Sequence, residues 1–294
     1  MSITWKRDSG LTARMTLSFI ILGILYVVFL SILHYLGVGY IPLAFIAGVM
    51  IMAQWYFSDK IVLWTSGAKI VTKEEYPQLH NIVENLVNKN SIPKPKVAVV
   101  NSGVPNAFAT GKSPRSSLIA VTTGILGLLD DEELEAVIGH ELTHVRNRDV
   151  LVLTLASVFS TLAWYLAQFS FFGGYQSRNR DSGNATVIVI LVAIVTWVVS
   201  FLIIRAISRY REYSADRGGA IMTGRPDKLA DALMKISGKM NKIPVNELQK
   251  VQKLNAFFII PALSGSTITN LFSTHPPVEK RVQKLKEMMT GVDR

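Results

Sequence analysis

The sequence predicts a mainly α-helical integral membrane protein, with four transmembrane helices and a soluble α+β domain that contains a small sheet. Three observations support this fold class. Of the 294 residues, 49% are hydrophobic and only 18% are charged, which is too apolar for an ordinary soluble domain. Long runs of the chain carry no charged side chain. Amphipathic segments and short β-branched segments lie between and after those runs.

Composition also excludes several kinds of chemistry. The chain has no Cys, so it has no disulfide framework, thiolate metal site or cysteine nucleophile. A net charge of +10 is typical of basic residues that flank membrane spans. The chain shows no interleaving of aromatic and basic residues and no nucleic-acid motif, so we expect no nucleic-acid partner.

The uncharged runs form two pairs of spans, since about 20 apolar residues cross a bilayer. Residues 15–58 contain no Asp, Glu, Lys or Arg and break between Gly37 and Pro42. Residues 150–177 and 182–204 are uncharged as well. The first run is too long for the apolar region of a signal peptide. Each run could instead be a buried core helix, but the presence of four such runs in one chain argues against that alternative. The predicted spans lie near residues 16–36, 41–57, 150–172 and 186–206.

Basic residues in the short flanks predict the orientation, because cytoplasmic loops carry an excess of Lys and Arg. Arg178 and Arg180, between the third and fourth spans, oppose this bias but are outnumbered. We therefore expect a multi-pass membrane protein with both termini and the soluble segments in the cytoplasm. The basic residues on that side are Lys6, Arg7, Arg14, Lys60, Lys69, Arg205, Arg209 and Arg211.

The soluble segments carry helical and strand patterns. Thr72 and Glu75 have capping-box spacing and predict the start of a helix, as do Asp130 and Glu133. Short β-branched runs near residues 97–100 and 118–122, bounded by Pro, Gly and Ser, predict strands. Helical apolar positions are Leu79, Ile82, Val83, Leu86, Val87, Leu134, Val137, Ile138, Leu142, Val145, Leu229, Leu233, Ile236, Val278, Val282 and Leu285.

The most informative motif is H-E-x-x-H at His140, Glu141 and His144. Residues four apart lie on one face of a helix, about one turn apart, so two imidazoles can bind one zinc ion. The glutamate beside the first histidine can then act as a general base on water. The alternative is an amphipathic helix with two incidental histidines, which is less attractive because the chain has only five histidines.

Two histidines do not complete a catalytic zinc site, which usually has three protein ligands. Glu212 and Asp216 are four residues apart just after the fourth predicted span. Glu212 is the candidate third ligand, and Asp216 could hold a ligand histidine by its other N–H. On spacing alone, a solvated helix in which both acids pair with nearby arginines explains the pattern equally well.

Two segments of the chain resemble a known family. The stretch from His140 to Asp149, together with Glu212-Tyr213-Ser214-Ala215-Asp216, resembles the M48 family of membrane zinc metalloproteases, and the order of spans resembles its HtpX-like branch. The resemblance covers nearly the whole chain. It implies a gluzincin-like core, one Zn²⁺ bound by His140, His144 and Glu212, and Glu141 as the catalytic base.

Two further segments resemble the family. Asn106-Ala107-Phe108-Ala109-Thr110-Gly111 is similar to the edge strand that pairs with an extended substrate, which makes Asn106, Ala107 and Phe108 candidate substrate-binding residues. A surface loop between strands is the alternative. His275-Pro276-Pro277 resembles the segment whose histidine stabilises the oxyanion of the transition state. The alternative for His275 is a helix cap before prolines at the first helical positions.

The resemblance predicts a zinc endopeptidase that cleaves misfolded or damaged membrane proteins at the cytoplasmic surface of a prokaryotic plasma membrane, as part of protein quality control and the stress response. Its expected partners are polypeptide substrates and the lipid bilayer. An inactive scaffold with a structural zinc site is the alternative, but such a site has no use for Glu141. A small transporter is a third hypothesis, but it predicts charged groups inside the spans. Residues 15–58 and 182–204 contain none. The expected parts are a tail at 1–14, membrane hairpins at 15–58 and 150–206, and a catalytic domain formed by 59–149 and 207–294.

Overall fold

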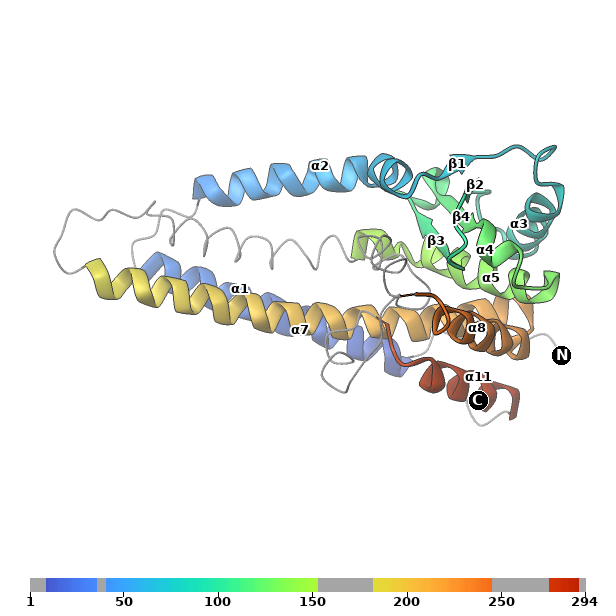
Figure 1. Cartoon of the computed structure of the whole chain (residues 1–294). Coiled ribbons are helices and arrows are strands. Elements are labelled where there is room, and N and C mark those ends of the chain that lie inside the picture. The colour runs from blue at the N-terminus through green and yellow to red at the C-terminus, as the bar shows by residue number, and fades with distance from the viewer. Residues whose placement is uncertain (1–8, 36–40, 153–181, 245–274, 291–294) are drawn as a thin grey trace. The chain divides into compact units, whose positions relative to one another are not determined.

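The computed structural model describes residues 9–35, 41–152, 182–244 and 275–290 (Figure 1). The chain divides into two compact units. One unit combines residues of Ser9–Tyr56 with residues of Leu151–Ile207, and the other combines Phe57–Val150 with residues of Ser208–Arg294. Each unit is described by itself below.

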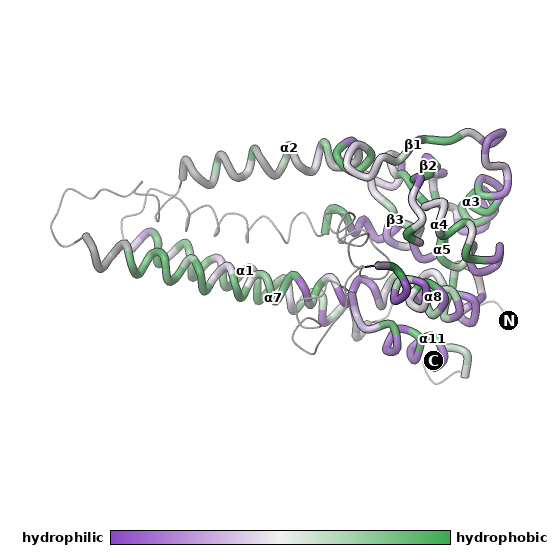
Figure 2. The backbone as a smooth tube through the Cα atoms, viewed as in Figure 1, coloured by the Kyte–Doolittle hydropathy of each residue, from purple (hydrophilic) through white to green (hydrophobic). Residues whose placement is uncertain are grey.

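The first unit contains most of the apolar sequence. Its helices are α1 (Ser9–Tyr35), most of α2 (Ile41–Ser66) and the first part of α7 (Ser182–Thr223). Within the described residues, Thr12–Tyr35 and Val187–Thr223 are long and apolar enough to cross a membrane. Figure 2 shows hydrophobic residues along α1 and the first part of α7, with hydrophilic residues gathering in the last part of α7. The third predicted span, near residues 150–172, falls almost entirely outside the described residues.

Helices α1 and α7 pack against each other in this unit. Leu22, Phe29 and Leu33 of α1 form a buried cluster with Val189 and Ala193 of α7. The cluster also contains a polar contact, since the Tyr26 hydroxyl lies 3.1 Å from the Ser200 hydroxyl. In an apolar environment such a pair satisfies two groups that would otherwise lack partners.

The second unit is built on a four-stranded sheet with the strand order β1-β2-β4-β3. The strands are β1 (Lys69–Ile70), β2 (Lys96–Val100), β3 (Ala107–Thr110) and β4 (Leu118–Thr122). β2 and β4 are parallel, whereas β1 and β3 are antiparallel to their neighbours. The strands predicted near 97–100 and 118–122 are therefore confirmed as β2 and β4, and β3 forms one edge of the sheet.

Alternate residues of the strands face two different hydrophobic clusters. Val97 and Ile119 belong to the main core, whereas Ala98 and Ala120 face a smaller cluster that includes Val62 of α2. This alternation is the period of two that a strand imposes. The main core packs one face of the sheet against α3 (Pro77–Asn90), α4 (Thr123–Leu126), α5 (Asp131–Asn147), α8 (Pro226–Met240) and α11 (Val278–Thr290).

One predicted boundary is wrong. The capping-box spacing at Thr72 and Glu75 predicts a helix that starts directly after Thr72, but α3 begins at Pro77 with Tyr76 before it. The Thr72 N–H does donate to a Glu75 carboxylate oxygen (2.7 Å), yet these residues form a turn. A proline lacks an N–H and restricts the preceding residue, so it is tolerated at the first helical position and not deeper inside. A short 3₁₀ helix, Pro114–Ser116, follows β3.

Candidate metal centre

Helix α5 carries the H-E-x-x-H motif. Its start is the predicted capping box, in which Asp130 accepts from the Glu133 N–H (2.9 Å) and Glu133 accepts from the Asp130 N–H (3.0 Å). The helix turns its motif toward the protein interior, because His140 is 1% exposed and Glu141 is 4% exposed. The one-turn separation of His140 and His144 brings their Nε2 atoms to 3.2 Å.

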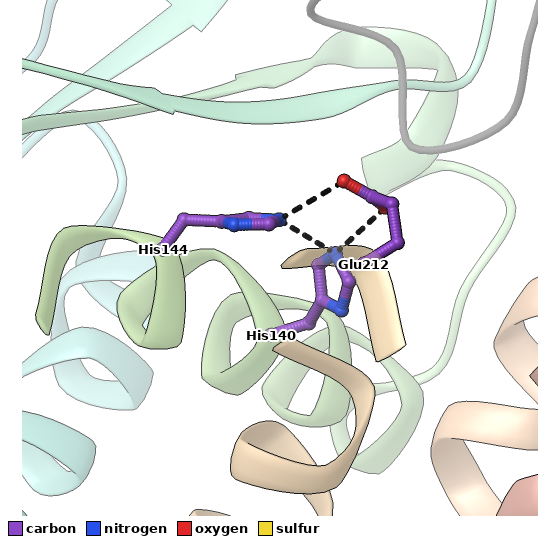
Figure 3. A group of neighbouring side chains, drawn as sticks. All are labelled: His140, His144 and Glu212. Carbon is purple, nitrogen blue, oxygen red and sulfur yellow. Dashed lines mark hydrogen bonds and ion pairs between the residues drawn. The ribbon is translucent and has the colours of Figure 1, made fainter. Parts of the chain in front are cut away.

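Glu212 completes a three-residue cluster from a different helix. It lies on α7, and its Oε1 is 3.5 Å from His144 Nε2 while its Oε2 is 3.7 Å from His140 Nε2. Figure 3 shows the two rings rising from α5 toward the Glu212 carboxylate. One donor atom from each residue lies within 4.8 Å of the other two.

The outer nitrogens of both histidines face carboxylates. His140 Nδ1 lies 3.0 Å from Asp216 Oδ1, and His144 Nδ1 lies 2.5 Å from Asp149 Oδ2. A carboxylate only accepts hydrogen bonds, so in a neutral imidazole the Nδ1 carries the proton and the Nε2 keeps its lone pair. The Asp216 contact is the one that the spacing of Glu212 and Asp216 suggests, whereas the Asp149 contact was not predicted.

These contacts test whether the cluster fits a metal ion. The two Nε2 lone pairs face each other, with the negative Glu212 carboxylate beside them. Three electron-rich groups in a buried position repel one another unless a cation lies between them. Two imidazole nitrogens and one carboxylate are a donor set that suits zinc and other divalent transition metals. The residues therefore fit a metal ion.

Two buried arginines support the carboxylates around this cluster. Arg281 is fully buried, and its Nε and Nη2 donate to the two Asp216 carboxylate oxygens at 2.8 and 2.6 Å. Arg211 Nε lies 3.1 Å from Asp149 Oδ2. Neither arginine was predicted. Arg281 comes from α11, 65 residues after Asp216, so no local pattern indicates its contact.

His275 lies beside the third member of the cluster. It is buried, and its Nδ1 is 3.1 Å from Glu212 Oε2. The helix-cap alternative for His275 is wrong, because α11 begins at Val278 and the Lys280 and Arg281 N–H groups donate to the Pro277 carbonyl. The two prolines therefore precede the helix and separate His275 from its first turn.

Glu141 lies between the cluster and the edge strand. It is not one of the three converging residues. Its carboxylate accepts a hydrogen bond from the Ala109 N–H of β3, which acts to lower its pKa. Burial raises the pKa of Glu141 to about 7, with His144 acting in the opposite direction. Burial would also raise the pKa of Glu212, but His275 and His144 hold it well below its ordinary value.

The alternation of hydrogen bonds along β3 decides which backbone groups face its open edge. The Thr122 N–H donates to the Asn106 carbonyl (2.9 Å), and the Asn106 N–H donates to the Thr122 hydroxyl (2.9 Å). Antiparallel pairs alternate, so Phe108 also pairs with β4, whereas the N–H and C=O of Ala107 and Ala109 point away from β4. Of the candidates Asn106, Ala107 and Phe108, only Ala107 directs its backbone groups away from β4. Ala109 also directs its backbone groups away from β4, and its N–H bonds to Glu141.

The sequence profile of peptidase family M48 matches residues 73–289, which include all of these groups. The chain belongs to peptidase family M48. It is therefore a metal-dependent membrane protease that acts on polypeptides. The Protease HtpX homolog 2 of Methanosarcina mazei is 51% identical over 289 residues, which cover 98% of both chains. The Protease HtpX homolog of Moorella thermoacetica is 51% identical over 96% of this chain and 95% of its own.

A solved structure shares the fold. The crystal structure of Ste24p from S. mikatae aligns with a TM-score of 0.56 at 19% identity. The match covers 92% of this chain and 64% of Ste24p, so this chain spans just under two thirds of that longer protein. At this identity the likeness concerns the fold alone.

A pair of glycines sets the spacing of the two helices that carry the candidate metal site of this M48 protease. A Cβ added to Gly219 of α7 would lie 2.7 Å from the His140 nitrogen and 2.9 Å from the His140 Cα. A Cβ added to Gly139 of α5 would lie 2.9 Å from a methyl of Thr223. The backbones of α5 and α7 therefore touch next to His140, which lets Glu212 reach the histidines.

We expect Gly219→Ala to damage the metal site. The added methyl meets helix backbone, which cannot move aside as a flexible side chain can, so α5 and α7 must separate. Overpacking of this kind costs about 1–3 kcal/mol, and we expect a lower thermal midpoint. We also expect zinc affinity to fall by about tenfold or more, equivalent to about 1.4 kcal/mol. Calorimetric unfolding and zinc titration of the purified protein measure both effects.

Gly238→Ala is the matched control for this substitution. Gly238 lies within α8, and a Cβ there meets nothing within 4 Å. Alanine is favoured over glycine in a helix by about 1 kcal/mol, so this variant should bind zinc normally and be no less stable. Wild-type zinc affinity in Gly219→Ala would contradict the proposed role of the helix crossing.

Proposed function

We propose that this membrane metalloprotease is a zinc-dependent endopeptidase that cleaves misfolded or damaged membrane proteins at the cytoplasmic face of a prokaryotic plasma membrane. The observation that carries this proposal is the convergence of His140, His144 and Glu212 beside Glu141. In this proposal the first three residues hold one Zn²⁺ per chain. Bound there, the ion would acidify water and polarise the scissile carbonyl.

The remaining steps belong to the chain's own residues. Glu141 removes a proton from the attacking water and later donates it to the leaving amine. Its pKa near 7 suits such an exchange, although a bound cation would favour its ionised form. His275, which is held beside Glu212, donates a hydrogen bond to the oxyanion that develops as water attacks. Asp216 keeps the His140 Nε2 directed at the ion through the contact at Nδ1.

The open edge of β3 is the proposed substrate platform. An extended polypeptide can pair with the outward N–H and C=O of Ala107 and with the outward C=O of Ala109, which is the form of recognition called strand addition. The Glu141 contact with Ala109 then places the base beside the paired chain. Substrates in this proposal must be unfolded or extended where they are cleaved, because folded segments have no free strand to add.

The course of α7 supports the proposed membrane location. We propose the four-span arrangement with hairpins at 15–58 and 150–206, a tail at 1–14, and a catalytic domain formed by 59–149 and 207–294. Glu212 lies eight residues after Ile204, where the uncharged run ends, and both belong to α7. Eight helical residues span about 12 Å. The metal centre is therefore expected close to the cytoplasmic bilayer surface.

The proposal is tested with full-length protein purified in detergent. Unfolded membrane proteins and unfolded soluble proteins are each incubated with it, with and without a zinc chelator. We expect cleavage that stops with chelator, returns when Zn²⁺ is added back, and is faster for membrane proteins. Cleavage that survives the chelator would contradict the metal mechanism, and faster cleavage of soluble proteins would contradict the proposed substrate class.

The proposed orientation makes its own prediction. The chain has no Cys, so single cysteines can be introduced without background. Ser182→Cys, at the start of α7, should react with a membrane-impermeant thiol reagent on intact cells. Asn101→Cys, at an exposed position after β2, should react only after lysis. The reverse pattern would place the metal centre outside the cytoplasm.

A further inference from the structure

We propose that Asp149 and Arg211 form a positioning pair that holds the His144 imidazole in its metal-binding orientation. This inference rests on the proposed zinc site of His140, His144 and Glu212. Neither Asp149 nor Arg211 belongs to that cluster. Their role is argued from contacts, burial and backbone conformation.

The contacts of Asp149 converge on one oxygen atom. Asp149 is 2% exposed, and its Oδ2 lies 2.5 Å from His144 Nδ1 and 3.1 Å from Arg211 Nε. The Arg211 side chain is itself only 9% exposed. A buried carboxylate without a cationic partner is costly, so Arg211 is what makes a charged acid tolerable under His144. The acid in turn requires the Nδ1 proton, which leaves the Nε2 lone pair facing His140 and Glu212.

The backbone is bent to bring Asp149 there. Helix α5 ends at Asn147, and Arg148 takes the left-handed conformation with φ 56° and ψ 42°. Its N–H bonds back to the carbonyls of His144 and Val145. Glycine or asparagine is the usual residue at such a position, and another L-residue there costs roughly 1 kcal/mol or more. Arg148 interrupts the helix, and Asp149 begins the helical residues 149–152 with its carboxylate beside His144 Nδ1.

The same arrangement serves the other histidine. His140 Nδ1 faces Asp216, and Asp216 is held by the buried Arg281. Each histidine of the cluster therefore has a buried aspartate on its outer nitrogen, and each aspartate has a buried arginine. The two arginines come from different helices, which makes a chance repetition of the pattern a poor explanation. The repetition indicates that both outer nitrogens must be fixed for the inner nitrogens to meet one ion.

An ion pair that only stabilises the fold would have a different signature. Loss of a structural pair lowers the unfolding temperature but leaves zinc affinity unchanged in the protein that remains folded. Loss of a partner that orients a metal-binding histidine typically costs about 10–100-fold in metal affinity. Zinc affinity of the folded protein, measured by competition with a chromophoric chelator, therefore separates the two roles without any activity measurement.

The experiment compares Asp149→Asn, Arg211→Met and the double variant in full-length protein in detergent. We expect about 10–100-fold weaker zinc binding in Asp149→Asn and a smaller loss in Arg211→Met. If Arg211 acts through Asp149, the losses should not add in the double variant. With Co²⁺ as the probe, the visible absorption spectrum of Asp149→Asn should change, because a neutral amide holds the Nδ1 proton less firmly than a carboxylate and can also present its NH2 group to the ring.

Asp227→Asn is the matched control. Asp227 also pairs with an arginine, Arg225, at 3.3 Å, but both side chains are more than 40% exposed. This variant should bind zinc like the wild type. Zinc affinity within threefold of wild type in Asp149→Asn would overturn the proposal, as would additive losses. If Asp149→Asn does not purify folded, wild-type zinc affinity in Arg211→Met overturns it. Failure of the wild-type protein to bind zinc would instead overturn the proposed function.

Discussion

Glu141→Gln should abolish most proteolysis while leaving the metal bound. The substitution keeps the size of the side chain, but an amide cannot take a proton from water or return it to the leaving amine. General acid–base catalysis contributes roughly 10²–10⁴-fold, and we expect a loss in the upper part of that range or beyond. Zinc content should stay at the wild-type level, because Glu141 is outside the converging cluster.

The measurement is the rate of substrate cleavage per bound zinc ion. Glu135→Gln is the matched control, because Glu135 lies on the same helix and outside the cluster, and it should cleave at the wild-type rate. Near wild-type turnover in Glu141→Gln would rule out the proposed base. Loss of zinc from this variant would mean that Glu141 is a ligand.

Glu212→Ala should remove the third metal donor. Only His140 and His144 then remain of the three converging groups. We expect zinc affinity to fall by more than about 100-fold, which exceeds the loss typical of an outer partner. Arg281 keeps its hydrogen bonds to Asp216 in this variant, so the substitution does not leave the buried arginine without its main partner. We therefore expect a folded protein with little bound zinc.

Zinc content by atomic emission and affinity by chelator competition measure this effect. Glu212→Gln is a useful second variant, because it preserves the shape and replaces a charged donor by a weak neutral one. Glu135→Ala again serves as a control at a position outside the cluster. Full zinc occupancy with unchanged affinity in Glu212→Ala would exclude Glu212 as a ligand and direct attention to His275, which lies beside it.

The local features of the protein could be predicted from the sequence because they depend on residues close together in the chain. The capping box of Asp130 and Glu133 marks the start of α5, and the four-residue spacing of His140 and His144 places both on one face. Strands β2 and β4 follow from their β-branched runs. The capping-box spacing predicts too early a start for α3, which begins at Pro77, because the restriction that this proline imposes outweighs the spacing before it.

The sequence by itself determined the helix that carries the H-E-x-x-H motif, the candidate metal donors and the apolar runs, because periodicity and spacing encode each of these locally. Only the tertiary structure decided which groups meet. Arg281 reaches Asp216 from 65 residues away, and the Gly139–Gly219 crossing depends on the packing of two helices. Asp149 is near His144 in the chain, yet its contact depends on the left-handed turn at Arg148. Such contacts arise from the packing of distant segments and from a turn that is unusual for arginine, and no short-range pattern in the sequence records them.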